Sequence, residues 1–165
     1  IAGKEKSGVE YADKTIFLGQ NFVVVPVASN REKNLLLVES LAKQMGFGNI
    51  VRIDSKTHDE IIAYTSQLAH VLALALIDSD DNQVATGRFI GDSFRDLTRI
   101  AMINDDLWSE LMIENKAALL DKIEMLQKEL SRYRLLIAGG DYEGLRKAMK
   151  KSKEARLGIE KDIKS

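Results

Sequence analysis

Two histidines and one pair of arginines are the side chains whose types and spacing could support chemistry in this chain. His58 and His70 are the only histidines, and both fall in a stretch with the hydrophobic pattern of one helix. At 3.6 residues per turn, their separation places them roughly 120° apart around the helix axis. They therefore cannot chelate one metal ion as a pair spaced by four residues would. The chain also has no cysteine, so we expect no metal site.

His70 is the more informative histidine, because it is the only ionisable side chain between Gln67 and Asp78 in an otherwise apolar segment. Two interpretations are open. A histidine in this position can be a core residue whose hydrogen bonds are satisfied inside the protein, or it can face a ligand. His58 falls in the first turn of the same expected helix, where capping or surface exposure is its ordinary role.

Arg95 and Arg99 lie four residues apart and would share one face of a short helix, with Asp96 beside them. One interpretation is a solvated face with helix ion pairs, each contributing only about 0.2–0.5 kcal/mol. The alternative is ligand binding, because a planar guanidinium can hold a carboxylate through two parallel hydrogen bonds. The lysines near the C-terminus indicate a solvated helix face; they include Lys147, Lys150, Lys151 and Lys153.

The sequence contains no nucleotide-binding loop. The stretch from Gly3 to Gly8 superficially resembles a phosphate loop, but Val9 and Glu10 follow the second glycine where lysine and serine or threonine are required. The pattern G-x-G-x-x-G of dinucleotide-binding domains does not occur. The chain therefore carries no dinucleotide fingerprint of its own.

Composition narrows the class of protein. The 165 residues are 45% hydrophobic, enough for one ordinary core or two small cores that share an interface. Lys+Arg is 24 and Asp+Glu is 25, for a net charge of -1, so we expect no nucleic-acid partner. The longest apolar run, Val71–Ile77, is shorter than the roughly 18 residues that span a bilayer. We therefore expect a buried helix and no membrane. Without cysteine or a visible signal peptide, the expected compartment is the cytoplasm.

The first third of the chain has the pattern of a β-α-β unit. Phe22 to Val25 is a β-branched and aromatic run that predicts a buried strand. Ser29 and Glu32 predict a capping box at the start of a helix, and Ile50 to Ile53 predicts a second strand. Residues 1–53 should therefore form the last β-α-β piece of a parallel sheet.

From Asp54 onward the pattern is helical throughout. Thr57 and Glu60 predict a second capping box, which opens a helix that reaches about Asp78. The last two turns of that helix are apolar on every side, which is typical of a central buried helix.

Three further helices are expected after a polar loop. A short one falls near Phe94 to Met102, and Asn104 or Asp105 should cap a long one. A glycine pair ends the long helix, and Asp141 can cap the last. Apolar residues repeat along the long helix every three or four positions, as in a helix packed lengthwise on another: Leu119, Ile123, Leu126, Leu130, Tyr133 and Ile137.

Three segments occur in an order that is specific to one family, although each alone is unspecific. Residues 1–8 read IAGKEKSG, Thr57-His-Asp59 precedes Ser66-Gln-Leu-Ala-His70, and Phe94-Arg-Asp-Leu-Thr-Arg-Ile-Ala101 precedes Leu107-Trp108 and Asn115. They resemble, in turn, the stretch after the His-Pro pair, the His-Asp…Ser-His-Leu-Pro-His helix and the third signature of prephenate dehydrogenases. Gln67 and Ala69 depart from the His and Pro of the commonest motif.

The resemblance implies an enzyme of tyrosine biosynthesis that oxidatively decarboxylates prephenate, or arogenate, with NAD. Prephenate would give 4-hydroxyphenylpyruvate as hydride and carbon dioxide leave and the ring becomes aromatic. In the family, the histidine of the His-Pro pair is the base. That pair and the dinucleotide loop would lie upstream of Ile1. We therefore expect this chain to be a C-terminal part that is inactive alone and does not bind NAD tightly.

The resemblance also implies a mainly α architecture with two regions. Residues 1–53 would be the β-α-β remnant of a Rossmann-like NAD-binding domain. Residues 54–165 would form an all-helical dimerisation and substrate-binding domain, so the expected assembly is a homodimer.

Substrate-site roles follow from the same resemblance, position by position. Arg99 matches an arginine that pairs with a substrate carboxylate, and His70 and Ser66 match polar residues of the substrate-side helix. Glu5 matches an acidic residue near the pocket mouth, and Asp96 matches an acidic residue reached from the partner subunit. Trp108 matches a position in the wall of the pocket. No catalytic, cofactor-binding or metal-binding residue is expected within the chain.

A hypothesis of a different class stays open beside the enzyme. Because no complete catalytic set is present, the chain could instead be a non-catalytic helical dimerisation or ligand-sensing module. A His-Pro pair directly upstream of Ile1, preceded by a strand and G-x-G-x-x-G, would decide for the enzyme.

Overall fold

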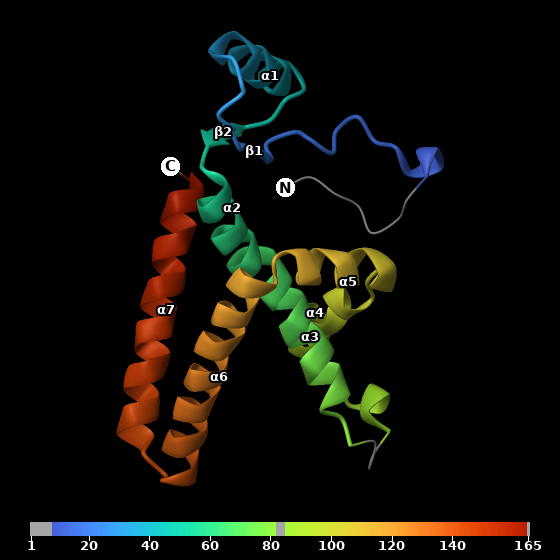
Figure 1. Ribbon diagram of the computed structural model, residues 1–165. Helices are drawn as coiled ribbons and strands as arrows, with labels where there is room; N and C mark the ends of the chain where they lie inside the picture. The colour runs from blue at the N-terminus through green and yellow to red at the C-terminus, as the bar shows by residue number, and fades with distance from the viewer. Residues whose placement is uncertain (1–7, 82–84, 165) are drawn as a thin grey trace. The chain divides into compact units, whose positions relative to one another are not determined.

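The structure is a computed structural model that describes residues 8–81 and 85–164 of the chain (Figure 1). The chain forms two compact units, and the boundary between them lies between Leu119 and Leu120. The first contains a small sheet and most of the helices, and the second contains a pair of long helices. The domain boundary that the sequence predicts, between residues 53 and 54, stays a prediction.

The expected parallel β-α-β unit is present. Strands β1 (Asn21–Val24) and β2 (Asn49–Arg52) pair in parallel with Phe22 opposite Ile50. Helix α1 (Glu32–Gln44) connects them and contacts both strands. The buried apolar side chains of this unit are Val24 on β1 and Ala42 on α1. A left-handed glycine, Gly46 (φ 91°), follows the helix, where its backbone N–H donates to the carbonyl of Lys43.

An ion cluster joins the end of the sheet to the helix. The guanidinium of Arg52 on β2 lies 2.8 Å from a carboxylate oxygen of Glu32 and also pairs with Glu39, both on α1. The hydrogen bond from Arg52 holds the pKa of Glu39 below its ordinary value. These exposed pairs fix the position of the helix on the strand more than they stabilise the fold.

Both capping boxes expected from the sequence are wrong. Before α1, the side chain of Asn30 accepts a hydrogen bond from the Val27 N–H (2.9 Å). The helix then begins after Arg31 without a side-chain cap. Before α2 (Ser55–Ile62), the carboxylate of Asp54 accepts from the N–H and the hydroxyl of Thr57, at 3.0 and 2.6 Å. An aspartate is available one turn earlier than the expected threonine, and it takes the cap position.

Helix α2 continues through a π-helical turn, Ala63–Gln67, into α3 (Leu68–Asp78). At the turn the Leu68 N–H donates to the carbonyl of Ala63, five residues back, which is the wide spacing of a π-helix. The expectation that the last two turns belong to a central buried helix is wrong for the single chain. In α3, Leu72 is 37% exposed and Ile77 43%, because the described residues cover it mainly with α4 (Asp92–Thr98) and the 3₁₀ turn Arg99–Ala101.

By length and composition alone, the continuous helix Ser55–Asp78 could cross a membrane. This criterion is weak, because core helices of water-soluble proteins also meet it. The absence of a membrane partner therefore stays a prediction.

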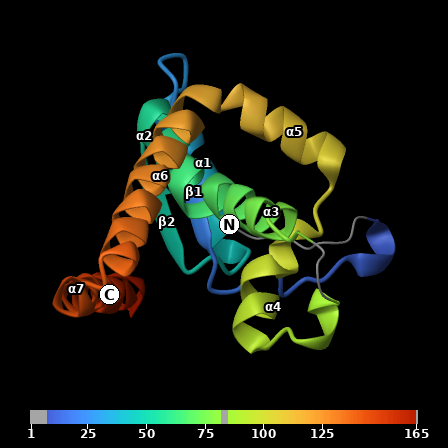
Figure 2. The same cartoon turned by 90° about the horizontal axis from the view of Figure 1, so that it is seen from below.

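The helix expected to run unbroken to Ile137 is in fact two helices. Asn104 caps α5 (Asp105–Glu114) by accepting from the Leu107 N–H at 3.0 Å. The backbone leaves the helical conformation at Asn115 (φ -102°, ψ 25°), and α6 (Lys116–Ala138) begins after it. Figure 2 shows α3 between α4 and α5. A short 3₁₀ turn, Thr86–Arg88, precedes α4.

The second unit is a hairpin of the remainder of α6 and α7 (Tyr142–Lys164) (Figure 1). Gly140 turns the chain in the left-handed conformation (φ 62°), and Asp141 caps α7, as expected, by accepting from the Gly144 N–H at 2.8 Å. The expected apolar seam of α6 is only partly covered in this hairpin. Tyr133 is half-buried, whereas Leu130 is 55% exposed and Ile137 is 65% exposed.

Candidate functional site

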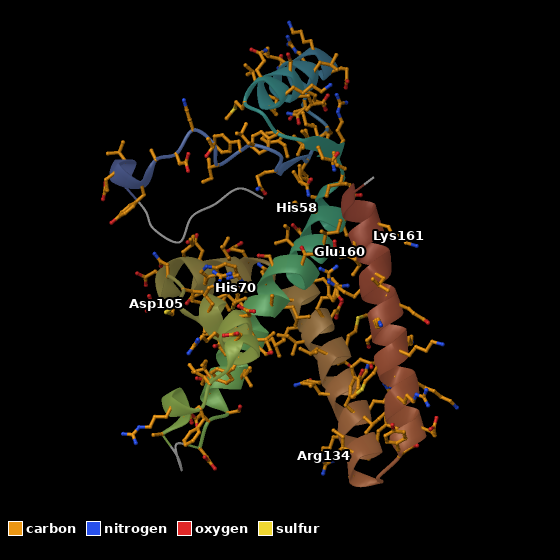
Figure 3. The ribbon with its side chains drawn as sticks, turned by 180° about the vertical axis from the view of Figure 1, so that it is seen from behind. His58, His70, Asp105, Arg134, Glu160 and Lys161 are labelled. Atoms are coloured by element: carbon orange, nitrogen blue, oxygen red, sulfur yellow. The ribbon has the colours of Figure 1, made fainter. Side chains whose placement is uncertain are left out.

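A stacked pair of rings lies where α3 meets α5. The imidazole of His70 and the indole of Trp108 have centroids 3.6 Å apart and planes inclined by 29°. Both side chains are half-buried. Figure 3 shows His70 on the side of α3 that faces the helix beginning at Asp105. Stacking of this kind restricts an imidazole to one orientation without removing it from solvent.

The hydrogen bond made by His70 determines which of its nitrogens can meet a ligand. Nδ1 lies 3.0 Å from the backbone carbonyl of Ser66. Because a carbonyl only accepts, Nδ1 carries a hydrogen in this contact, and Nε2 is the nitrogen left for a ligand. The two interpretations of His70 from the sequence are therefore compatible: one nitrogen is satisfied inside the protein, and the other can be offered outward.

Sequence reasoning did not assign a role to the polar network formed by Gln67 and Asn115. Gln67 is 4% exposed, and its amide donates to the carbonyl of Leu111 at 2.8 Å. Its side-chain oxygen accepts from the amide of Asn115 at 2.8 Å, and the same amide donates to the carbonyl of Asp59 at 2.9 Å. The signal in the sequence was a glutamine in an apolar helix, at a position where the family motif has histidine.

A cavity of about 620 Å³ lies beside α4, where Arg95, Asp96 and Arg99 line it. This volume is in the ordinary range for a small-molecule site. Its other lining residues are mostly apolar: Ile77, Ile90, Phe94, Thr98, Ala101 and Met102. Arg95 also faces Asp92 at 3.6 Å on a largely exposed surface, which fits the solvated ion pair considered from the sequence.

The structure thus places the predicted site residues in two neighbouring groups. His70 and Trp108 meet at the α3–α5 contact, where the backbone carbonyl of Ser66 holds Nδ1 of His70, whereas Asp96 and Arg99 line the cavity. Helix α3 joins the groups, because Ile77 in the cavity wall lies seven residues, or about 10 Å, along the axis from His70. Glu5 lies outside the described residues. Their substrate-binding roles stay predictions.

The remaining ionisable clusters offer no metal centre in the part of the chain that the structure describes. No group of three or more histidine, aspartate or glutamate side chains there could hold a metal ion. His58 instead lies 3.0 Å from the carboxylate of its neighbour Asp59, at the surface.

Comparison with known proteins identifies the family. The sequence model of the family described as "Prephenate dehydrogenase, dimerization domain" matches residues 54–151, more than half of the chain. Cyclohexadienyl dehydrogenase of Zymomonas mobilis is 29% identical over an alignment that covers 98% of this chain and 57% of that protein. Prephenate dehydrogenase of Bacillus subtilis is 26% identical, with coverages of 96% and 44%.

A solved structure gives the same result for the fold. The crystal structure of prephenate dehydrogenase from Aquifex aeolicus, in complex with hydroxyphenyl propionate and NAD⁺, superposes with a TM-score of 0.87 at 31% sequence identity. The match covers 96% of this chain and 57% of that one. The chain therefore spans about half the length of the relatives it matches. On these matches, the chain belongs to the prephenate dehydrogenase family and carries the dimerisation domain of that family.

Proposed function

We propose that this chain supplies the dimerisation region and one wall of the substrate site of a dehydrogenase that acts on prephenate or arogenate. The observation that carries the proposal is the family match over residues 54–151. A similar fold in an enzyme crystallised with hydroxyphenyl propionate and NAD⁺ supports it. That ligand combines an aromatic ring with a carboxylate. This chain offers a complement to each: the stacked rings of His70 and Trp108 for the aromatic ring, and Arg99 in the cavity wall for the carboxylate.

Each proposed role follows from the chemistry of the side chain. Arg99 holds a substrate carboxylate, since a guanidinium provides two parallel donors in the plane that a carboxylate needs. His70 offers Nε2 to a polar group of the substrate, because Nδ1 is engaged with Ser66. Trp108 fixes the imidazole, and Asp96 contributes a negative charge at the cavity. The apolar lining of the cavity suits a six-membered carbon ring.

The glycine-rich loop that binds a dinucleotide is not among the residues of this chain. In a dinucleotide-binding unit, a glycine-rich turn between the first strand and its helix lets the pyrophosphate approach the backbone. Here the connection from β1 to α1, residues 25–31, contains no glycine. We therefore assign to this chain the holding of the substrate, and we place the loop that binds the pyrophosphate of NAD in another part of the gene product.

A homodimer in the cytoplasm completes the proposal. Apolar side chains on the seam of α6 and on α3 remain exposed in the single chain, among them Leu130, Ile137 and Ile77. A second copy of the chain can cover such surfaces, and the two-fold dimer is the commonest arrangement among homo-oligomers. The family match is to a dimerisation domain, and this points in the same direction.

The proposal is tested by turnover of the complete gene product. We expect reduction of NAD that depends on added prephenate or arogenate, followed by the absorbance of the reduced nicotinamide. The 165-residue chain alone should show neither turnover nor tight binding of NAD by calorimetry. A complete gene product that forms dimers but turns over neither substrate would favour the non-catalytic helical module instead. Micromolar binding of NAD by the 165-residue chain would contradict the assignment of cofactor binding to another region.

A further inference from the structure

We infer that Gln67 is a positioning residue: it ties α3 to α5 and thereby sets the stacking of Trp108 on His70. The inference rests on the proposed function in one respect: these two rings belong to the proposed substrate site. Its evidence is the geometry of one buried amide and of the π-helical turn that ends with it.

Two contacts link the same pair of helices side by side. Gln67, the last residue of the π-helical turn that leads into α3, donates to the carbonyl of Leu111 on α5 at 2.8 Å. His70 on α3 stacks on Trp108 of α5. Each contact is three residues from the other along both helices. Residues at this spacing lie on neighbouring parts of one helix face. Because α3 and α5 are each stiff over one turn, holding the first contact restricts the distance and rotation available to the second.

The amide group of glutamine suits this position because it donates and accepts at once. The carbonyl of Leu111 can only accept, and the side-chain nitrogen of Asn115 can only donate. Gln67 satisfies both while it is 4% exposed. Asn115 uses its other amide hydrogen on the carbonyl of Asp59 in α2. The network therefore joins α2, the end of α5 and the start of α6 around a single buried side chain.

The π-helical turn sets the direction in which Gln67 and His70 together face relative to α2. The turn Ala63–Gln67 contains one residue more than an α-helical turn and so rotates the helix that follows by about 100° relative to an unbroken α-helix. Turns of this kind occur frequently at functional sites. Loss of the Gln67 contacts should leave the helices formed, but the rings of His70 and Trp108 should no longer be held in their stacked arrangement.

The test uses Trp108 as its own reporter, because it is the only tryptophan in the chain. In the wild type, His70→Leu removes the ring stacked on the indole, and we expect the intensity or wavelength of Trp108 emission to change. In a Gln67→Met background the two rings should no longer be held together. The same His70→Leu substitution should then change the emission little or not at all. Far-UV circular dichroism establishes that each variant is folded.

Two further variants separate positioning from general stability. Gln67→His restores one donor and one acceptor and should restore the effect of His70→Leu on the emission. Gln127→Met, at an exposed glutamine of α6, should leave that effect at its wild-type size. If Gln67→Met is folded and the effect of His70→Leu persists in full, the inference is overturned.

A second route covers the case in which Gln67→Met does not fold. The same pair of measurements is then made in a Gln67→Glu background, whose carboxylate still accepts from Asn115 but has no hydrogen to donate to the carbonyl of Leu111. Loss of the His70→Leu effect supports the positioning role, and its persistence overturns it. No substrate or turnover is required, so a failure here is distinguishable from a failure of the proposed function.

Discussion

The imidazole of His70 stacks on the indole of Trp108, with ring centroids 3.6 Å apart and ring planes inclined by 29°. Nδ1 of the same imidazole is engaged by the carbonyl of Ser66 at 3.0 Å. The ring is thus held on one face and at one nitrogen. Because Nε2 is the atom that remains for a ligand, packing by this side chain and its proposed recognition of the substrate can be separated by substitution.

His70→Phe should separate them in the complete gene product. A phenyl ring can still stack on Trp108, so the midpoint of thermal unfolding should change little. The polar contact to the substrate is lost, and an unsatisfied group on the substrate costs about 1–3 kcal/mol. The KM for prephenate or arogenate should therefore rise roughly ten- to hundredfold, while the KM for NAD stays near the wild-type value. An unchanged KM for the substrate would mean that His70 serves packing alone.

The β-α-β unit and the helical nature of the rest were predictable from the sequence because they depend on local periodicity. The run Phe22 to Val25 is β-branched and aromatic, and the observed strand is shifted from it by one residue towards the N-terminus. Helix starts were less predictable. Asp54, Ser55 and Thr57 can all cap a helix, and the choice among them depends on how the chain enters from β2, which the pattern does not contain.

Asp54 gives a prediction about pH, because the hydrogen bonds from Thr57 hold the pKa of its carboxyl below the ordinary value. A carboxyl whose pKa is lowered by folding stabilises the fold above its unfolded pKa. That stabilisation is lost as the pH falls through the folded pKa. Stability to urea, followed by circular dichroism, should therefore fall on acidification, and part of that fall should be absent in Asp54→Asn.

Two substitutions provide the controls for this experiment. Asp54→Ala removes the cap itself and should be less stable than the wild type already at neutral pH. Asp121→Asn removes an exposed carboxyl within α6 and should retain the acid dependence of the wild type. Identical acid profiles for Asp54→Asn and the wild type would show that the cap contributes no pH-dependent stability.

The break at Asn115 was not predictable, and its cause lies in tertiary contacts. Apolar spacing continues from α5 into α6, so a single helix satisfied the local pattern. Asn115 leaves the helix while its amide bonds to Asp59 and Gln67, which are 56 and 48 residues away in the chain. Hydrogen bonds between such distant residues outweigh the modest helix propensity of asparagine. For the same reason, Gln67 could be noticed in the sequence but its role could not be assigned.

The exposed seam of α6 gives a prediction about assembly. Leu130 is 55% exposed in the single chain. If a second copy covers this position, a charged side chain placed there would be buried without a partner, which is energetically costly. By light scattering at micromolar concentration, the 165-residue chain should be a dimer. Leu130→Glu should shift it towards monomer, and Gln127→Glu, which introduces the same charge on the same helix off the seam, should not. A wild-type monomer under these conditions would remove the basis for the proposed dimer.

The account rests most directly on Arg99, and steady-state kinetics of the complete gene product test it. If Arg99 holds a substrate carboxylate, Arg99→Ala removes a charged hydrogen-bonding partner, a change that costs about 2–5 kcal/mol when the remaining charge stays buried. The KM for prephenate or arogenate should then rise by roughly one to three decades, with little change in the KM for NAD. Arg95→Ala, one turn earlier and paired with Asp92 at the surface, should have a much smaller effect. A near-normal KM and turnover in Arg99→Ala would contradict the assignment of the substrate site.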